Sequence, residues 1–498
     1  MLLSSPMRKA LTILLAAILS IGCHADDRPN VIIFLADDLG YGDLSIYGAK
    51  QISTPNIDRL ADEGIRLTSF YAQPICGPSR AALLTGAYPL RVAEPGNKKH
   101  PNTIPHAKEV LLPEVLQSAG YRTAIIGKWH LAGEGEKTWE FAPPPSPLPD
   151  HPGGLGPFKP ELMPNQQGFE IFFGTPMHNG ISREVDNRRF TIELMRNGQV
   201  IESPTDNNLL TSKYTKEAIS FLRSEDNRPF FLLLSYNAPH TPLGVHPDFE
   251  GKSQKGRYGD AVEELDFSVG EITKALDLAG KADNTLIVFL SDNGPETRTV
   301  LGSDIGSTGH FRGGKYSNWE GGVRVPAIWW WPDRIPADKS INALTTIMDI
   351  YPTLAHLTGA ALPDQEMDGH NILPLLREPD SADSPYDVYY YHMLTQLQAV
   401  RVGEWKLVLP RVKDSPYLLW LGRYMDTVAA PELYNLHLDP EETEDLARTR
   451  PDIVDQLMKE ASKARVDLGD IYTIGRRARF FDAGPRRPDT YFVNTTNN

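Results

Sequence analysis

Four short apolar runs in the sequence are each followed by side chains that could bind ions or move protons. The pairs of run and polar segment are 31–36 with Asp37-Asp38, 123–126 with Gly127-Lys128-Trp129-His130, 230–234 with Asn237-Ala238-Pro239-His240, and 286–290 with Ser291-Asp292-Asn293-Gly294. Carboxylates and amides bind hard cations, and histidine and lysine transfer protons. If the four segments meet in space, they form a candidate active site.

The elements that would bring these segments together are strands of a parallel sheet. Apolar runs without polar alternation are typical of strands buried on both faces, and helical patterns over 113–119, 214–223 and 261–278 lie between them. This alternation predicts an α/β fold with a large, mostly parallel or mixed central sheet flanked by helices. Ligands of such sheets bind beyond the carboxyl ends of the strands, where all four polar segments would converge.

The chain divides into four segments. We expect a signal peptide over 1–25, a catalytic α/β domain over 26–380, a smaller α+β domain with an antiparallel sheet over 385–475, and a basic tail over 476–498. The boundary after 380 rests on a polar, proline-containing stretch at 377–385. Beyond it, strand-like runs at 388–392, 398–402 and 405–409 precede a helical pattern at 453–464. The arginines of the tail are expected in solvent or folded over the acidic body.

The first 25 residues predict export to the periplasm or the cell exterior. Arg8 and Lys9 precede an apolar run at 10–21 and then small residues, which is the order of a secretory signal. The run is too short for a transmembrane anchor, which needs about 20 apolar residues. Cleavage could follow Ala25, or it could precede Cys23, in which case Cys23 would carry a lipid anchor.

Composition excludes several classes of protein. The 498 residues are 41% hydrophobic, which supports a large buried core, and only two are cysteines, too few for a disulfide scaffold. A net charge of −14 argues against a binder of nucleic acid or of long polyanions, because such surfaces collect lysine and arginine.

The one cysteine left after export, Cys76, lies in an unusual motif. Cys76-Gly77-Pro78-Ser79-Arg80 is followed by Ala81-Ala82-Leu83-Leu84-Thr85-Gly86. This segment resembles the signature of the type I, formylglycine-dependent sulfatases of the alkaline phosphatase superfamily. The resemblance covers nearly the whole mature chain and extends to residues 35–44, 54–60, 127–131, 238–242, 291–294, 313–324 and the arylsulfatase-like 166–169, 173–176 and 432–436.

The resemblance implies an enzyme that hydrolyses sulfate esters to an alcohol and sulfate. A maturation enzyme would oxidise Cys76 to formylglycine, and one hydroxyl of the aldehyde hydrate would attack sulfur. Asp37, Asp38, Asp292 and Asn293, together with the modified Cys76, would hold a divalent cation that faces the hydrate, with Ca²⁺ preferred to Mg²⁺ for an all-oxygen site.

The remaining roles also follow from the family. Arg80, four residues after Cys76 on the same helix, would steady the hydrate. Lys128 and Lys315 would contact sulfate oxygens, His130 would hold and deprotonate the hydrate, and His240 with Lys315 would protonate the leaving oxygen. His178 and Asn179 occupy the place of substrate-pocket residues in related sulfatases, or they are an ordinary loop pair.

The substrate class is expected to be small sulfated molecules or short sulfated saccharides, because export and an acidic surface fit these better than a long polyanion. Two alternatives remain open at this point. One is a phosphonate monoester or phosphodiester hydrolase of the same superfamily, and the other is a non-catalytic, glycan-binding relative.

Overall fold

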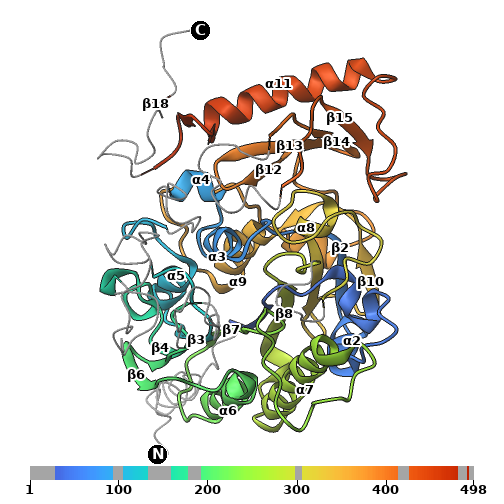
Figure 1. The fold of residues 1–498 in the computed structure, drawn as a ribbon. Helices are drawn as coiled ribbons and strands as arrows, with labels where there is room; N and C mark the ends of the chain where they lie inside the picture. The colour runs from blue at the N-terminus through green and yellow to red at the C-terminus, as the bar shows by residue number, and fades with distance from the viewer. Residues whose placement is uncertain are drawn as a thin grey trace, which may run out of the picture.

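The computed structural model describes residues 28–93, 105–132, 159–177, 192–297, 305–412 and 425–479, together with the backbone of 491–492 (Figure 1). The predicted signal peptide, Cys23, and the pair His178 and Asn179 lie outside the described residues. Within the described part of the chain, no helix has the length and apolar character needed to cross a bilayer.

The centre of the molecule is a mixed sheet of eleven strands. Ten strands follow the order β10-β2-β9-β8-β1-β7-β3-β4-β5-β6, and β11 also pairs with β2. Their bounds are β1 Asn30–Ala36, β2 Ile65–Tyr71, β3 Arg122–Gly127, β4 Ile171–Gly174, β5 Leu194–Arg196, β6 Gln199–Glu202, β7 Phe230–Ser235, β8 Thr285–Ser291, β9 Arg324–Trp330, β10 Lys339–Ile341 and β11 Thr345–Thr346. The predicted α/β fold with a large mixed sheet is confirmed.

The four apolar runs of the sequence are the central strands β8, β1, β7 and β3. These strands are neighbours, and every pairing among them is parallel. All of their side chains are buried except that of Asn30, which is half-buried. Burial on both faces explains why these strands lack polar alternation. Their carboxyl ends lie at one edge of the sheet, as predicted.

Helices cover both faces of the sheet. On one face lie α2 (Pro55–Asp62), α6 (Leu210–Leu222) and α7 (Gly256–Leu278), which share a core with the side chains of Ile32 and Phe34. On the other face lie α3 (Cys76–Thr85), α5 (Leu112–Ser118), α9 (Ile350–Thr358) and α10 (Leu373–Arg377), which share a core with Ile33 and Leu35. The odd and even residues of β1 therefore face different layers, as the two-residue period of a strand requires.

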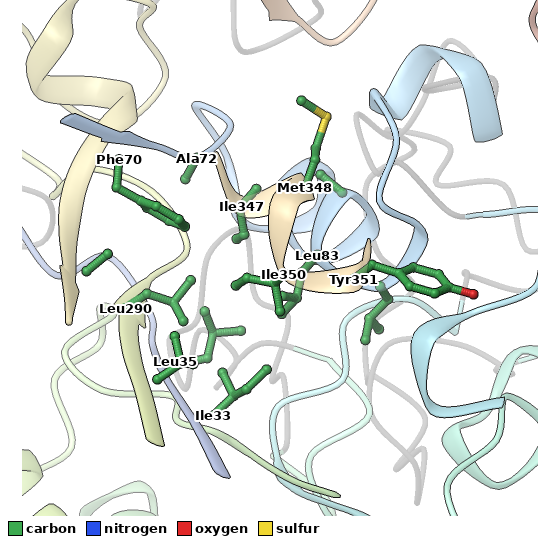
Figure 2. Packing of buried hydrophobic residues seen from close by; sticks show 14 of the residues in the cluster. Ile33, Leu35, Phe70, Ala72, Leu83, Leu290, Ile347, Met348, Ile350 and Tyr351 are labelled. Atoms are coloured by element: carbon green, nitrogen blue, oxygen red, sulfur yellow. The ribbon is translucent and has the colours of Figure 1, made fainter. Parts of the chain in front are cut away.

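Helix α3 is buried along its whole length. Figure 2 shows it packed beside the segment formed by the 3-10 helix η7 (Ile347–Asp349) and α9, with Leu83 close to Ile350. The helix ends at Gly86, whose φ of 64° is the left-handed conformation that glycine adopts without steric cost. The start of α3 is consequently held rigidly against the sheet.

A smaller antiparallel sheet follows in the C-terminal region. Its order is β12 (Tyr389–Met393), β13 (Gln396–Val402), β14 (Trp405–Val408) and β15 (Glu432–Asn435). Helix α11 (Pro451–Asp467) packs on its outer face, and the inner face lies against the end of the molecule that carries α3, α4 (Pro89–Val92) and α8 (Glu320–Val323) (Figure 1). The predicted antiparallel sheet is confirmed, while the domain boundaries at 380, 385 and 475 stay predictions.

The last described residues lie against the body of the protein. A short sheet joins β16 (Gly469–Asp470), β17 (Thr473–Ile474) and β18 (Tyr491–Phe492). In the segment predicted as a basic tail, Arg477 pairs with Asp467 and Glu366, and Arg479 pairs with Glu109. In residues 476–479, the described start of the predicted tail, these two arginines are therefore paired with acidic groups.

Candidate active site

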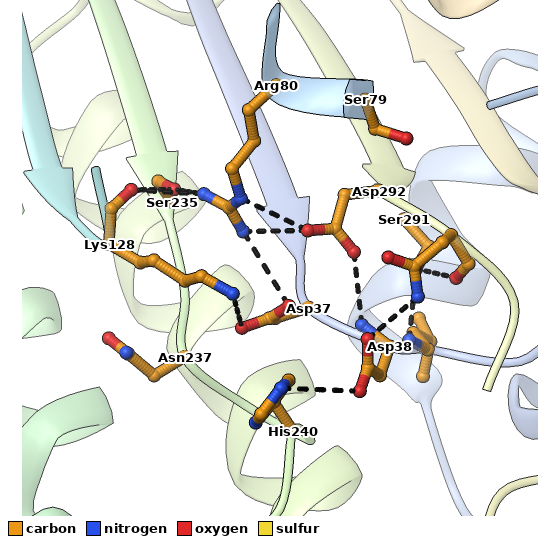
Figure 3. A network of polar contacts seen from close by, with 12 residues as sticks. Asp37, Asp38, Ser79, Arg80, Lys128, Ser235, Asn237, His240, Ser291 and Asp292 are labelled. Carbon is orange, nitrogen blue, oxygen red and sulfur yellow. Dashed lines mark hydrogen bonds and ion pairs between the residues drawn. The ribbon is translucent and has the colours of Figure 1, made fainter. Parts of the chain in front are cut away.

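The polar segments at the ends of β1, β3, β7 and β8 converge beside the first turn of α3 (Figure 3). The backbones of β3 and β7 are packed closely where these two strands end. Gly127, the last residue of β3, has a φ of 119°, and a Cβ there would lie 1.8 Å from the carbonyl oxygen of Ser235. Only glycine fits here, because any side chain at position 127 would collide with the backbone of β7.

Cys76 is the first residue of α3, and its side chain is buried. Burial raises the pKa of the thiol to about 11, although the ammonium groups of Lys128 and Lys315 lower it. The backbone amides of a helix start favour negative charge at this position. An unmodified Cys76 would therefore be a protonated, weak nucleophile at neutral pH.

Arg80 links three of the converging segments. Its Nε and Nη2 donate to Oδ2 of Asp292 at 3.1 and 2.9 Å, and its Nη1 donates to the carbonyl oxygen of Lys128 at 3.0 Å. Nη1 also contacts the hydroxyl of Ser235, which donates to the same carbonyl oxygen at 2.6 Å. A planar guanidinium can make these divergent bonds at once, which a lysine ammonium cannot.

Two lysines each bind one carboxylate of the Asp37-Asp38 pair. Lys128 Nζ lies 2.6 Å from Asp37 Oδ2, and Lys315 Nζ lies 2.6 Å from Asp38 Oδ2. Burial would raise the pKa of Asp37, but the charges of Lys128, His240 and Arg80 outweigh it and hold that pKa well below the usual value. Asp37 is therefore ionised despite complete burial.

The site shifts the pKa values of His240 and Lys315 in opposite directions. Burial lowers the pKa of His240 to about 4, and the nearby charge of Lys315 contributes. Burial would lower the pKa of Lys315 too, but the carboxylate of Asp38 holds it well above its ordinary value. At neutral pH the pair consists of a neutral imidazole and a charged ammonium.

The donor set fits a divalent cation. One ligand atom from each of Asp37, Asp38, Cys76 and His240 lies within 4.8 Å of the others. Asp37 Oδ1 and Asn293 Oδ1 are buried, and neither accepts a hydrogen bond from any residue that the structure describes. Buried oxygens of this kind are costly unless a cation or donor satisfies them, so the residues present suit a hard metal ion.

Two predicted ligands have further roles. Asp292 is outside the group of four, and its Oδ2 is occupied by Arg80 while its Oδ1 accepts the Asp38 amide at 3.2 Å. Asn293 Nδ2 donates to Asp38 Oδ1 at 2.7 Å, which turns its own Oδ1 away from that carboxylate. Asp292 thus orients both Arg80 and Asp38.

His130 lies at the same edge, after β3. Its backbone amide donates to the carbonyl oxygen of Pro176 at 3.0 Å, and its φ is 65°. Left-handed backbone is unfavourable for a residue of this size and concentrates at functional sites. Hydrogen bonds, ion pairs and the grouping around Cys76 bring together nine of the predicted catalytic and metal residues: Asp37, Asp38, Cys76, Arg80, Lys128, His240, Asp292, Asn293 and Lys315. His130 follows β3 at the same edge of the sheet.

Several site residues were missed by the sequence reasoning. Tyr316, with a φ of 69°, follows Lys315, and its ring centre is 5.3 Å from the Lys315 ammonium. Met393, Leu394 and Met425, from the small sheet and the segment before β15, belong to the same buried apolar cluster as Cys76. Tyr316 could have been found from its place beside Lys315, but no pattern in the sequence connects the C-terminal residues to position 76.

Comparison with known proteins agrees with this geometry. A family model described as Sulfatase matches residues 29–360, and one described as N-sulphoglucosamine sulphohydrolase, C-terminal, matches residues 310–467. The chain is 38% identical over 406 residues to N-acetylgalactosamine-6-sulfatase of Canis lupus familiaris, covering 77% of this chain and 72% of the relative. It is 36% identical over 441 residues to steryl-sulfatase of Homo sapiens, covering 76% and 74%.

Solved structures resemble the fold over most of its length. A Bacteroides thetaiotaomicron protein from a locus for metabolism of multiple glycosaminoglycans has a TM-score of 0.71 at 28% identity, covering 88% of this chain and 99% of that one. The PsFucS1 sulfatase from Pseudoalteromonas sp. has a TM-score of 0.70 at 28% identity, covering 93% and 94%. The chain therefore belongs to the sulfatases of the alkaline phosphatase superfamily and is a hydrolase of sulfate esters.

Proposed function

We propose that Cys76 is oxidised to formylglycine by a maturation enzyme and that its hydrate is the nucleophile of sulfate ester hydrolysis. The observation that carries this proposal is the grouping of Cys76 with Asp37, Asp38 and His240 within 4.8 Å. The hydrate would supply one hydroxyl for attack on sulfur and a second whose loss of a proton releases sulfate. Arg80, Lys128 and Lys315 surround this point with positive charge suited to a sulfate group.

We propose Ca²⁺ as the cation, held by Asp37, Asp38 and Asn293 with Asp292 completing or orienting the set. When bound, the cation would add positive charge for the sulfate oxygens. The oxygen-rich donors favour Ca²⁺ or Mg²⁺ over softer metals, and Ca²⁺ tolerates irregular sites better.

The chain's own residues would handle the protons and the orientation. Lys128 and Lys315 would hold sulfate oxygens, with Lys128 itself fixed by Asp37 at 2.6 Å. His130 would take the proton of the hydrate. Lys315, charged beside Asp38, would protonate the departing alkoxide, and the neutral imidazole of His240 would assist by donating a hydrogen bond to the same oxygen. Such proton transfer is worth about 10² to 10⁴ in rate for a poor leaving group.

We propose short sulfated saccharides or small sulfate esters as substrates, with His178 and Asn179 as pocket residues. The curated relatives named above are called N-acetylgalactosamine-6-sulfatase and steryl-sulfatase, so sugar and sterol esters both belong in a substrate panel. We also propose export through residues 1–25, with a lipid anchor if cleavage precedes Cys23.

The test is sulfate release by protein made in a host that oxidises such cysteines. Mass spectrometry of the peptide containing residue 76 should detect the aldehyde, and Cys76→Ala should abolish release from every ester in the panel. Cys23→Ala, a change at the only other cysteine, is the control and should leave the hydrolysis rate unchanged. Activity that survives Cys76→Ala would refute the proposed nucleophile, and faster cleavage of matched phosphate esters would refute the substrate class.

A further inference from the structure

The small C-terminal sheet places a fully buried lysine against the loop that carries Lys315. Lys406, on β14, donates from Nζ to the carbonyl oxygen of Asn318 at 2.8 Å and to Glu320 Oε1 at 3.0 Å. The same ammonium forms an ion pair with Glu442 Oε1 at 2.8 Å. Lys406, Glu320 and Glu442 are almost completely buried. Glu320 has a second cationic partner, Arg324 at 3.5 Å, so within this cluster it is Glu442 that depends most on Lys406.

Further contacts join the same loop to the C-terminal region. Asn318 Nδ2 donates to Gln398 Oε1, on β13, at 3.0 Å. Trp319 Nε1 donates to Asp426 Oδ2 at 2.7 Å, and the amide of Glu320 donates to Glu442 Oε2 at 2.8 Å. Together with Lys406, side chains from four C-terminal segments thus bind residues 318–320.

The other end of the loop is tied to the active site. The amide of Lys315 donates to the carbonyl oxygen of Pro295 at 2.8 Å, and the amide of Tyr316 donates to that of Pro74 at 3.0 Å. Pro74 lies two residues before Cys76. Only two residues lie between Lys315 and Asn318, so a shift of the bound end of the loop would displace the ammonium that lies 2.6 Å from Asp38.

Backbone strain supports a positioning role for the cluster. Asparagine and aspartate adopt positive φ at low cost, and among the other described non-glycine residues only His130, Tyr316, Leu394 and Glu442 do so. The first three belong to the catalytic edge or to the residues around Cys76. The fourth residue, Glu442, has a φ of 57° and contacts Lys406 and Glu320. Its strained backbone therefore belongs to the cluster around Lys406.

We propose that Lys406 is a positioning residue for catalysis: it fixes residues 318–320 and thereby sets the distance of Lys315 from the leaving oxygen. This inference rests on the proposed role of Lys315 as a proton donor. The small sheet is then part of the catalytic apparatus without touching the substrate.

The leaving group separates positioning from a purely structural role. An alkyl sulfate needs a proton on its departing oxygen, whereas 4-nitrophenolate leaves without one. A displaced Lys315 would lose its contact with the sulfate group in both esters, but its proton matters only for the alkyl ester, so hydrolysis of the alkyl sulfate should slow by about 100-fold more than that of 4-nitrophenyl sulfate. General loosening of the fold would reduce both rates alike.

Two variants test this. Lys406→Met leaves Glu442 buried without its cation, while Glu320 keeps Arg324, so the variant should have a lower melting temperature. Lys406→Met with Glu442→Gln removes the uncompensated charge and should recover most of that loss, but it does not restore the bond to Asn318. We expect the double variant to melt near the wild type and to keep the selective loss on the alkyl ester.

Controls and a milder variant complete the experiment. Arg91→Met breaks a buried ion pair with Asp368 that does not involve the loop, and should change both ester rates by the same factor. Gln398→Leu removes the bond to Asn318 and should give a smaller loss that is again selective for the alkyl ester. Cys76→Ala removes both activities in any case, which tests the proposed function separately.

Recovery of both activities in the double variant would overturn the positioning role. So would an equal loss on the two esters in every Lys406 variant.

Discussion

Replacing Arg80 should destabilise the protein strongly, because Arg80 is the partner of a buried carboxylate. Arg80 is 2% exposed and Asp292 is 0% exposed, and the two share hydrogen bonds of 3.1 and 2.9 Å. Arg80→Met would leave Asp292 buried without its cation, which costs about 3 to 5 kcal/mol. It would also leave the Lys128 carbonyl oxygen without one of its two donors.

Arg80→Lys should lower the free energy of unfolding by a smaller amount than Arg80→Met. A lysine keeps the positive charge, but its ammonium cannot donate to Asp292, Ser235 and the Lys128 carbonyl from separate branches. The loss of one or two buried hydrogen bonds is worth about 1 to 3 kcal/mol in the free energy of unfolding. The double variant Arg80→Met, Asp292→Asn should recover much of the loss of Arg80→Met, since no uncompensated charge remains.

The assay is urea unfolding followed by circular dichroism, in the presence of a chelator so that metal binding does not contribute. The control is Arg196→Met, which removes an exposed pair with Glu217 at 2.6 Å and should cost less than about 1 kcal/mol. The reasoning from burial is wrong if the free energy of unfolding of Arg80→Met lies within about 1 kcal/mol of the wild-type value, or if Arg196→Met lowers that free energy by as much as Arg80→Met does.

Three further predictions concern acid, metal and the loop after β1. Burial lowers the pKa of His392 from 6.5 to about 4, so between these two pH values the imidazole is protonated in the unfolded chain but not in the folded one. The free energy of unfolding should therefore fall by up to about 3 kcal/mol as the pH drops from 6.5 to 4. Urea unfolding of His392→Leu should show a flatter pH profile, and an unchanged slope would contradict this. Chelation by EGTA should abolish sulfate release and lower the melting temperature, and Ca²⁺ should restore both at a lower concentration than Mg²⁺. Asp38→Asn should weaken the response of the protein to added Ca²⁺. Calorimetry that shows no effect of chelation on the melting temperature would argue against a metal site. Asp43 is buried and accepts bonds from Gly40, Ser307 and Tyr258 at 3.0, 2.9 and 2.6 Å, so Asp43→Asn should cost about 1 to 3 kcal/mol in urea unfolding, and a value near zero would exclude it as an anchor of this loop.

The central strands were predictable because burial on both faces leaves a direct mark on sequence. The runs that became β1, β3, β7 and β8 are apolar at consecutive positions, and a parallel sheet covered by helices buries such strands completely. The antiparallel strands β2 and β9 were not predicted. Their pairing joins Ile65 to Trp329, and a pairing between such distant residues has no local signal.

The sequence by itself determined which residue types stand at the strand ends and which cysteine opens α3, since strand period, helix spacing and the motif around Cys76 are local properties. Tertiary structure decided the pairing of those residues: Lys128 with Asp37, Lys315 with Asp38, and Arg80 with Asp292. It also brought Lys406 to Glu320 across 86 residues of chain. The physical reason is that short-range ion pairs and hydrogen bonds form only after the sheet and its packed helices have fixed where distant segments meet, and neither charge nor hydrophobicity along the chain specifies that meeting point.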